Sequence, residues 1–438
     1  MLFKDITMVD ENFEVREHAY VGVKGDTVEY ISDTMPEEDF GEVYDGKNRL
    51  LLPAFYNLHS HLAMSLMRGY SENLPLMMWL QGRIFPFEAQ LTSEDMYYGT
   101  LLGTAEMLRY GIASTSDMYL DQLSTARALA DSGVKANVSQ CVTWMGTEPY
   151  ESLPVYQGAV TLLREYKDFP NGRIRPEISL HAEYTSTEKI AKAVAAFAQD
   201  NGASIHVHVS ETQGEVDICR KRHQRRSPVR YLSDCGIFDV PAVAAHCVHV
   251  DDEDLEILKE HNVTVASCPK SNAKLASGVC PVASLREAGI NVAIGTDSVA
   301  SNNSLNMIEE MRFFNLLQKG LRNDPTVLTP AETLYAATRA GALGQKREDC
   351  GLIKVGFKAD LTVMDTEKIY LKPVHNVLNN LVYSADGADV VLTMADGRVL
   401  YKDGEYTTLD IERITWECEK ARKRILGVLA EQTVPELG

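Results

Sequence analysis

The feature that most constrains this 438-residue sequence is a strand-then-helix rhythm that repeats between about residue 54 and residue 297. Short apolar segments alternate with longer segments whose apolar residues recur at helical spacing. Capping residues separate them, such as Thr92 and Asp95 before one helix and Gly133 after another. The rhythm predicts an α/β fold, a (β/α)8 TIM-like barrel. Its strands are expected at residues 50–61, 112–118, 136–142, 174–181, 204–208, 243–246, 263–267 and 291–297.

The two ends of the chain carry a different pattern, in which apolar and polar residues alternate. Residues 1–53 and 350–404 are each too short for a stable sheet domain, so together they predict one discontinuous β-sandwich. The barrel is expected over residues 54–349. Residues 405–438 predict a C-terminal helical segment that packs on the barrel or on the sandwich.

The composition argues against several classes of partner. A net charge of −19 opposes binding to nucleic acid, because neutralising phosphates needs a clustered basic surface. No apolar run approaches the ~18 residues of a membrane helix. The cysteines form no C-x-x-C pair, so we expect buried free thiols. We therefore expect a cytoplasmic, soluble protein that binds a small molecule, with homo-oligomerisation left open.

Histidines and one aspartate stand at the ends of the predicted barrel strands. His59 and His61 end the first strand, His208 the fifth and His246 the sixth, while Asp297 ends the eighth. In such barrels the carboxyl ends of the strands meet at the face where reactions occur. Imidazoles with one carboxylate suit a zinc-like ion that keeps a position open for water and lowers the pKa of that water towards ~7. The pattern predicts a metal-dependent hydrolytic site.

Several motifs resemble the amidohydrolase superfamily, and within it the branch of 5-methylthioadenosine/S-adenosylhomocysteine deaminases. The resemblance implies that His59, His61, His208 and Asp297 hold one divalent metal ion. Zinc is expected, with iron, nickel and manganese as alternatives, and no strand-end lysine marks a second metal. The superfamily motifs are at 53–61, 208–212, 245–249 and 295–303, and the branch motifs at 66–69, 74–80, 268–275 and 354–361.

The resemblance also implies hydrolytic deamination of an adenine nucleoside to the hypoxanthine nucleoside and ammonia. Glu211 would donate a proton to the ring, His246 would hydrogen-bond the attacking hydroxide, and Asp297 would carry a proton to the leaving amine. The predicted catalytic residues are thus Glu211, His246 and Asp297, and the predicted substrate-binding residues are Glu88, His181, Trp79 and Glu211.

One departure from the branch bears on substrate choice. Relatives that accept S-adenosylhomocysteine hold its carboxylate with arginines, and the matching position of one of them here is Gln140. A carboxylate without a cationic partner loses a charge-assisted hydrogen bond of about 1.5–3 kcal/mol. We therefore expect methylthioadenosine, 5′-deoxyadenosine or adenosine to be preferred over S-adenosylhomocysteine. Arg68 and Arg83 are the candidates that could replace the missing arginine.

Two other functions compete with this interpretation. The same metal site could serve a deaminase or dechlorinase of guanine, pterin, cytosine or triazine rings, which a panel of amino-heterocycles would separate. A non-catalytic scaffold is the second, and metal analysis tests it. A nucleic-acid deaminase is disfavoured, because the H-x-E…P-C-x-x-C pattern is missing.

Overall fold

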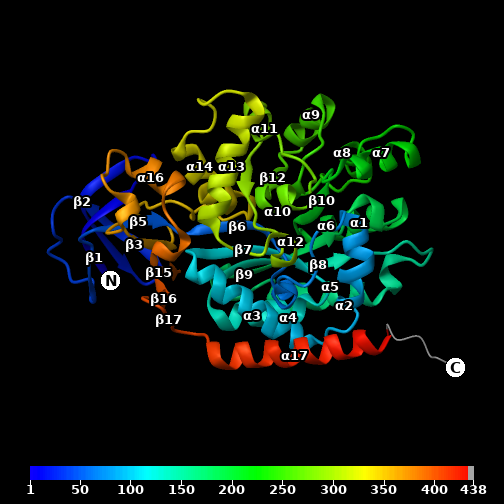
Figure 1. Ribbon diagram of the computed structural model, residues 1–438, viewed down its shortest axis with the longest axis horizontal. Coiled ribbons are helices and arrows are strands. Elements are labelled where there is room, and N and C mark those ends of the chain that lie inside the picture. Colours follow the sequence, from blue (N-terminus) through cyan, green and yellow to red (C-terminus); the bar gives the residue numbers. More distant parts are fainter. Residues whose placement is uncertain (433–438) are drawn as a thin grey trace.

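The protein, described here as a computed structural model over residues 1–432, has an eight-stranded parallel barrel beside a nine-stranded mixed sheet (Figure 1). The barrel strands follow one another in chain order, and each pairs parallel with the next. The predicted (β/α)8 barrel beside a β unit built from both chain ends is confirmed; in place of the expected β-sandwich, that unit is one continuous mixed sheet. The barrel strands are β6 (Phe55–Ser60), β7 (Ile112–Tyr119), β8 (Lys135–Val142), β9 (Ile174–Leu180), β10 (Ile205–Val209), β11 (Ala242–His246), β12 (Thr264–Ser267) and β13 (Val292–Ile294).

The barrel closes between its first and last strands, β6 and β13. The backbone N–H of Asp297 donates to the carbonyl of His59 at 2.9 Å, just beyond the end of β13. The Asn57 amide donates to the Thr296 hydroxyl at 2.7 Å, and the Asn57 side-chain carbonyl accepts the Thr296 backbone N–H at 2.9 Å. Predicted metal ligands therefore lie at the closure itself.

Helices surround the barrel, and their ends follow the capping signals of the sequence. Thr92 and Asp95 form a reciprocal capping box, and Gly133 ends α4 with a left-handed φ of +88°, which glycine adopts without strain. The longer helices are α3 (Ser93–Arg109), α4 (Gln122–Ser132), α5 (Pro154–Tyr166), α6 (Glu188–Asn201), α7 (Gln213–Arg222), α9 (Asp252–Glu260), α13 (Met307–Arg322) and α14 (Pro330–Ala337). The shorter ones are α8 (Pro228–Asp234), α10 (Pro269–Lys274), α11 (Val282–Glu287), α12 (Val299–Asn302) and α15 (Arg339–Gly344).

The mixed sheet joins both ends of the chain through the antiparallel pair β5 and β14, around a core that includes Leu51, Val363 and Leu392. All nine strands are hydrogen-bonded into one continuous sheet. They are β1 (Leu2–Val9), β2 (Val15–Lys24), β3 (Thr27–Ser32), β4 (Val43–Asp45), β5 (Arg49–Pro53), β14 (Leu361–Asp365), β15 (Val390–Ala395), β16 (Arg398–Lys402) and β17 (Glu405–Tyr406).

The expectation of a single strand over residues 50–61 is wrong, because this apolar run divides at Ala54. The backbone N–H of Ala54 donates to the carbonyl of Asp360, whereas the next N–H, of Phe55, donates to the carbonyl of Gly111. The chain thus leaves the mixed sheet at β5 and enters the barrel at β6. Both segments are buried, so apolarity alone does not show the change of partner.

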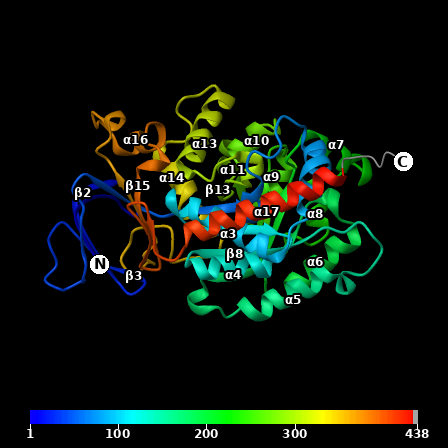
Figure 2. The same cartoon turned by 60° about the horizontal axis from the view of Figure 1, so that its bottom comes forward.

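The last helix, α17 (Ile411–Gln432), lies along α3 on the outside of the barrel (Figure 2). A shorter helix, α16 (Val377–Tyr383), packs against α13 and α14. The end of the predicted C-terminal segment, residues 433–438, lies outside the described residues. Among the described helices, none is both long and apolar enough to cross a membrane.

A buried ion cluster connects the barrel to the mixed sheet. The ammonium of Lys135, at the start of β8, lies 2.5 Å from a carboxylate oxygen of Asp360 and 2.6 Å from one of Asp396. The hydroxyl of Tyr56 also donates to Asp360. Replacing one partner of such a cluster leaves uncompensated charge in a site that water does not reach.

Lys135→Met is therefore expected to lower the free energy of unfolding by about 3–5 kcal/mol, measured by urea denaturation. Lys192→Met serves as the control, because Lys192 pairs with Glu188 at the surface and its loss should change stability little. Equal losses in the two variants would contradict the role assigned to the cluster.

Candidate active site

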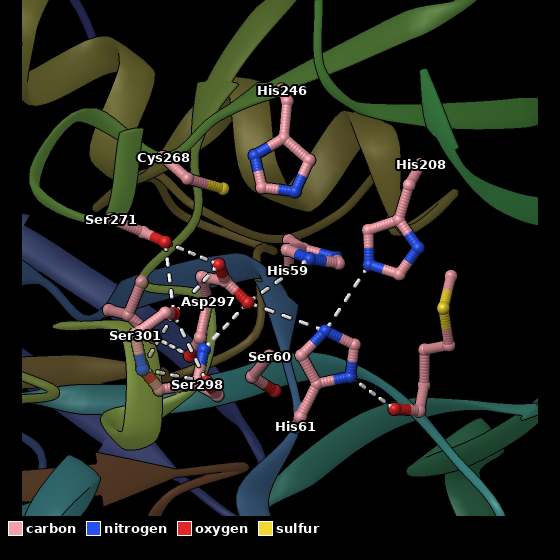
Figure 3. Close-up of polar contacts among 12 residues, drawn as sticks. His59, Ser60, His61, His208, His246, Cys268, Ser271, Asp297, Ser298 and Ser301 are labelled. Atoms are coloured by element: carbon pink, nitrogen blue, oxygen red, sulfur yellow. Dashed lines mark hydrogen bonds and ion pairs between the residues drawn. The ribbon is translucent and has the colours of Figure 1, made fainter. Parts of the chain in front are cut away.

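The imidazoles of three histidines and one carboxylate oxygen converge at the carboxyl end of the barrel strands (Figure 3). His61 Nε2 lies 3.3 Å from Asp297 Oδ1 and 3.3 Å from His208 Nε2. His59 Nε2 lies 3.6 Å from the same Asp297 oxygen. The residues predicted as ligands thus surround one small volume. Their donor atoms fall into two overlapping groups, His59, His61 and His208 in one and His59, His246 and Asp297 in the other.

The second ring nitrogen of each histidine is held from behind. His61 Nδ1 donates to the Met118 carbonyl at 2.5 Å, and His208 Nδ1 donates to the His181 carbonyl at 2.7 Å. His59 Nδ1 lies 3.0 Å from Nε2 of His206, which sits behind the site. Such contacts orient the rings and direct the Nε2 lone pairs inward.

Two observations show that this donor set fits a metal ion. The Nε2 atom of His59 is buried and lacks a hydrogen-bond partner among the described residues. The donors are imidazole nitrogens and one carboxylate oxygen, the set that zinc and similar divalent ions prefer. A buried polar atom without a partner is costly, which favours a ligand at this position.

Asp297 is oriented by its neighbour Ser298, by Ser301 on α12 and by Ser271 on α10. The hydroxyls of Ser271 and Ser301 donate to Oδ2 at 2.5 and 2.9 Å, and the Ser298 backbone N–H donates to Oδ1 at 2.7 Å (Figure 3). Its backbone has a left-handed φ of +58°, and that of His246 has +72°. Such conformations cost about 1–3 kcal/mol in non-glycine residues and persist where surrounding contacts enforce them.

Burial and pairing set the charges of the site. Burial lowers the pKa of His59 to about 3 and that of His181 to about 4. Burial also opposes charge on His61, but its hydrogen bond to Asp297 and the charge of that carboxylate raise its pKa to about 9. Burial opposes charge on Asp297, but the nearby imidazoles of His59 and His61 hold its pKa well below its usual range. Asp297 is therefore the negative group of the centre.

Glu211 and His246 face each other beside this centre. Glu211 Oε2 lies 4.0 Å from His246 Nε2, and the Ser277 hydroxyl donates to Glu211 Oε1 at 3.2 Å. His246 Nδ1 donates to the side-chain carbonyl of Asn272 at 2.9 Å. Burial raises the pKa of Glu211, so this carboxyl group retains a proton more readily than an exposed glutamate.

A cavity of about 590 Å³ opens over the site, within the usual size of small-molecule pockets. Trp79, Glu88 and His181 line it, together with the predicted ligands and catalytic residues other than His59, which lies beneath. Trp79 ends α1 (Leu76–Trp79), and Glu88 ends α2 (Phe85–Glu88); the π-helix Leu80–Ile84 connects the two. Burial raises the pKa of Glu88 to about 7.

The outer part of the cavity is apolar and carries no cation. No lysine or arginine is among the described residues that line it. Arg68 instead binds Glu106 and the Asn303 carbonyl, and Arg83 is exposed outside the cavity. Gln140 is not among the residues that line the cavity, and its side-chain amide donates to the Leu120 carbonyl at 2.6 Å. The exposed apolar side chains at the mouth are Met77, Phe85, Leu120 and Met145.

Sequence reasoning left four supporting residues without a role. Ser271, Asn272 and Ser301 contact the predicted catalytic residues. They lie within the motifs 268–275 and 295–303, but the motifs assign no contact to them. Glu215 contacts the backbone of Glu211 at 2.7 Å. Thr212 and Glu215 have the T-x-x-E spacing of a capping box, which is the one sequence pattern that could have drawn attention to Glu215.

Comparison with known proteins covers nearly the whole chain. A sequence profile described as “Amidohydrolase family” matches residues 50–400. The chain is 40% identical over 420 residues to a 5-methylthioadenosine/S-adenosylhomocysteine deaminase of Dictyoglomus thermophilum, covering 96% of this chain and 97% of that protein. It is 39% identical over 399 residues to a 5′-deoxyadenosine deaminase of Methanothermobacter thermautotrophicus, with coverage of 91% and 92%. The resemblance stated from the motifs is confirmed.

Solved structures agree with this picture. The fold matches the crystal structure of an adenosine deaminase from Xanthomonas campestris with bound zinc, at a TM-score of 0.91 and 30% sequence identity. The match covers 97% of this chain and 98% of that one. Barrel and mixed sheet are therefore both shared with a solved protein.

Proposed function

The chain belongs to the amidohydrolase family and is a hydrolase that acts on C–N bonds, and we propose that it deaminates an adenine nucleoside hydrolytically to the hypoxanthine nucleoside and ammonia. One observation carries the proposal. Glu211, His246 and Asp297 face a single cavity around the convergent donors, and Glu88 and His181 line the same cavity. The names of the two deaminase relatives and of the zinc-containing adenosine deaminase support the choice of ring.

His59, His61, His208 and Asp297 would hold one divalent cation, for which zinc is our first candidate. When bound there, it would supply a nucleophile from water near neutral pH and stabilise the charge that develops on the ring. The unpaired Nε2 of His59 and the zinc in the similar solved structure support this assignment.

The protein's own groups would move the protons. Glu211 protonates the ring nitrogen beside the reacting carbon, which draws negative charge away from the position under attack. His246 accepts a hydrogen bond from the attacking oxygen through Nε2, because its Nδ1 donates to Asn272. Asp297 takes the proton of the attacking oxygen and passes it to the departing amine. A carbon–oxygen bond forms, the carbon–nitrogen bond breaks, and ammonia leaves.

Three cavity residues would bind the nucleoside. Glu88 would accept hydrogen bonds from the ribose hydroxyls, since it is an acidic group on the wall formed by α2. His181 would contact the purine, and its lowered pKa keeps it neutral at pH 7. Trp79 would form an apolar wall, because its indole N–H is already engaged by the Ser71 carbonyl at 3.2 Å.

The lining of the cavity supports a preference for uncharged 5′ groups. A charged amino-acid tail at the 5′ position would enter a region where the described lining has no cation and several exposed apolar side chains. Methylthioadenosine, 5′-deoxyadenosine and adenosine carry no such charge. We therefore propose zinc as the native metal and these three nucleosides as the preferred substrates.

We expect kcat/KM for methylthioadenosine to exceed that for S-adenosylhomocysteine by about 10-fold or more, from the ~1.5–3 kcal/mol of an absent charge-assisted hydrogen bond. Met145→Arg places a cation at the mouth and should narrow this ratio, whereas Met145→Gln should not. An advantage of S-adenosylhomocysteine in the unmodified enzyme would refute the preference.

The proposed activity itself is tested by ammonia release from a panel. It contains adenosine, 5′-deoxyadenosine, methylthioadenosine and S-adenosylhomocysteine beside guanine, cytosine, a pterin and a chlorotriazine. Turnover of a member of the adenine group, with little of the others, is the expected result. Preference for any of the other rings would overturn the proposal in favour of that chemistry.

A further inference from the structure

Glu215 is a buried acidic residue in the first turn of α7, and its side chain accepts hydrogen bonds from the backbone that carries Glu211. One carboxylate oxygen accepts the Ser210 backbone N–H at 2.9 Å, and the other accepts the Glu211 backbone N–H at 2.7 Å. Among the described residues no lysine, arginine or histidine forms an ion pair with Glu215. Its side chain is therefore engaged by the peptide groups of this turn, that of Thr212 included.

The Ser210–Glu211 turn has a strained backbone and also makes hydrogen bonds to the segment that follows His246. Ser210 has a left-handed φ of +51°, which a serine adopts only when surrounding contacts enforce it. The Ser210 carbonyl accepts the backbone N–H groups of Val248 and His249 at 3.1 and 3.0 Å. Those residues are two and three positions after His246 in the chain. The turn thus lies between Glu215 and the segment that carries the other catalytic candidate.

A helix cap is the ordinary explanation for a glutamate at this position, and the chain contains a matched example. Glu332 occupies the same third position of α14 and forms a capping box with Thr329, its carboxylate accepting the Thr329 N–H at 2.8 Å. Glu332 is outside the cavity and pairs with Arg286. Glu215 differs because its oxygens reach Ser210 and Glu211, which precede the Thr212 cap.

We propose that Glu215 is a positioning residue for the proposed deamination, on which this inference rests. Its two oxygens hold the Ser210–Glu211 turn so that the Glu211 carboxyl group faces His246 and the ring to be protonated. The direction of the Glu211 side chain follows from the orientation of the peptide whose N–H Glu215 accepts. A displacement of about 1 Å in a catalytic group can cost ~100-fold in rate.

The test replaces the carboxylate by an amide of the same shape. Glu215→Gln keeps one acceptor oxygen and turns an NH2 group towards a peptide N–H, so one of the two hydrogen bonds is lost. We expect kcat to fall about 10- to 100-fold, while KM and the inhibition constant of the hypoxanthine nucleoside change less than ~3-fold. Glu332→Gln is the matched control and should leave kcat and KM near their original values.

Melting temperature and metal content are measured for both variants. Unchanged values with a lower kcat show that the Glu211 carboxyl group is displaced in a folded enzyme. Glu215→Asp keeps both acceptor oxygens on a shorter side chain and should retain more of kcat than Glu215→Gln, even where the latter folds poorly. Retention of kcat within twofold by folded Glu215→Gln, with an active parent enzyme, overturns this inference alone. A parent enzyme that hydrolyses no nucleoside of the panel overturns the proposed function and this inference with it.

Discussion

Glu211→Gln is expected to lower kcat about 10²- to 10⁴-fold, the range that a positioned proton-transfer group contributes. Glutamine has the same shape and can still accept the hydrogen bond that Ser277 donates to Glu211 Oε1. It cannot deliver a carboxylic proton to the ring. The loss should therefore appear in kcat, while KM and the melting temperature stay close to those of the unmodified enzyme.

The measurement is steady-state deamination of whichever adenine nucleoside the enzyme turns over best, together with metal content per chain. Glu253→Gln is a suitable control, since Glu253 lies on the exposed side of α9 and only weakly pairs with Arg230 at 3.7 Å. A Glu211→Gln enzyme that keeps more than a tenth of the original kcat would remove Glu211 from the proton-transfer role.

Removal of divalent cations is expected to abolish hydrolysis and to lower the melting temperature, and added zinc is expected to restore both. Binding to the folded chain alone stabilises it in proportion to the logarithm of the cation concentration over Kd, about 4 kcal/mol at 1,000 times Kd. The converging donors of His59, His61, His208 and Asp297 give such a cation its site.

The same expectation separates ligands from other histidines. His208→Ala should lower bound metal to well below one ion per chain, whereas His261→Ala should leave it unchanged because His261 contacts the Phe238 carbonyl far from the site. Full metal content with full activity in His208→Ala would contradict the donor set. Activity that survives exhaustive chelation would contradict the dependence on metal.

The parts of the site that the sequence predicts are those tied to a periodic element. His59 lies on β6 and His61 directly follows the end of that strand, two residues on. His208 and His246 come at the ends of β10 and β11, and Asp297 follows β13. The repeated strand–helix unit of the barrel then brings these strand ends to one face. This periodicity needs no knowledge of contacts between distant segments.

What could not be predicted depends on such contacts. The sequence predicts a boundary between the two units after residue 53, but the unbroken apolarity of residues 50–61 gives no sign that the strand itself divides there, with Ala54 and Phe55 bonded to different sheets. Ser271 and Asn272 reach Asp297 and His246 only through the path of the chain after β12. Gln140 is another example. Matching its position to the arginine of related proteins does not reveal that the next residue of β8, Cys141, is the one that lines the cavity.

The closure of the barrel has a consequence for how this protein is made. Asn57 and Thr296 are 239 residues apart, and their two hydrogen bonds lie beside His59 and Asp297. A nascent chain still lacking β13 presents imidazoles but not the carboxylate of the centre. The complete donor set therefore exists only once late synthesis has returned the chain to its first barrel strand. Tight capture of the proposed cation would therefore report that the barrel has closed.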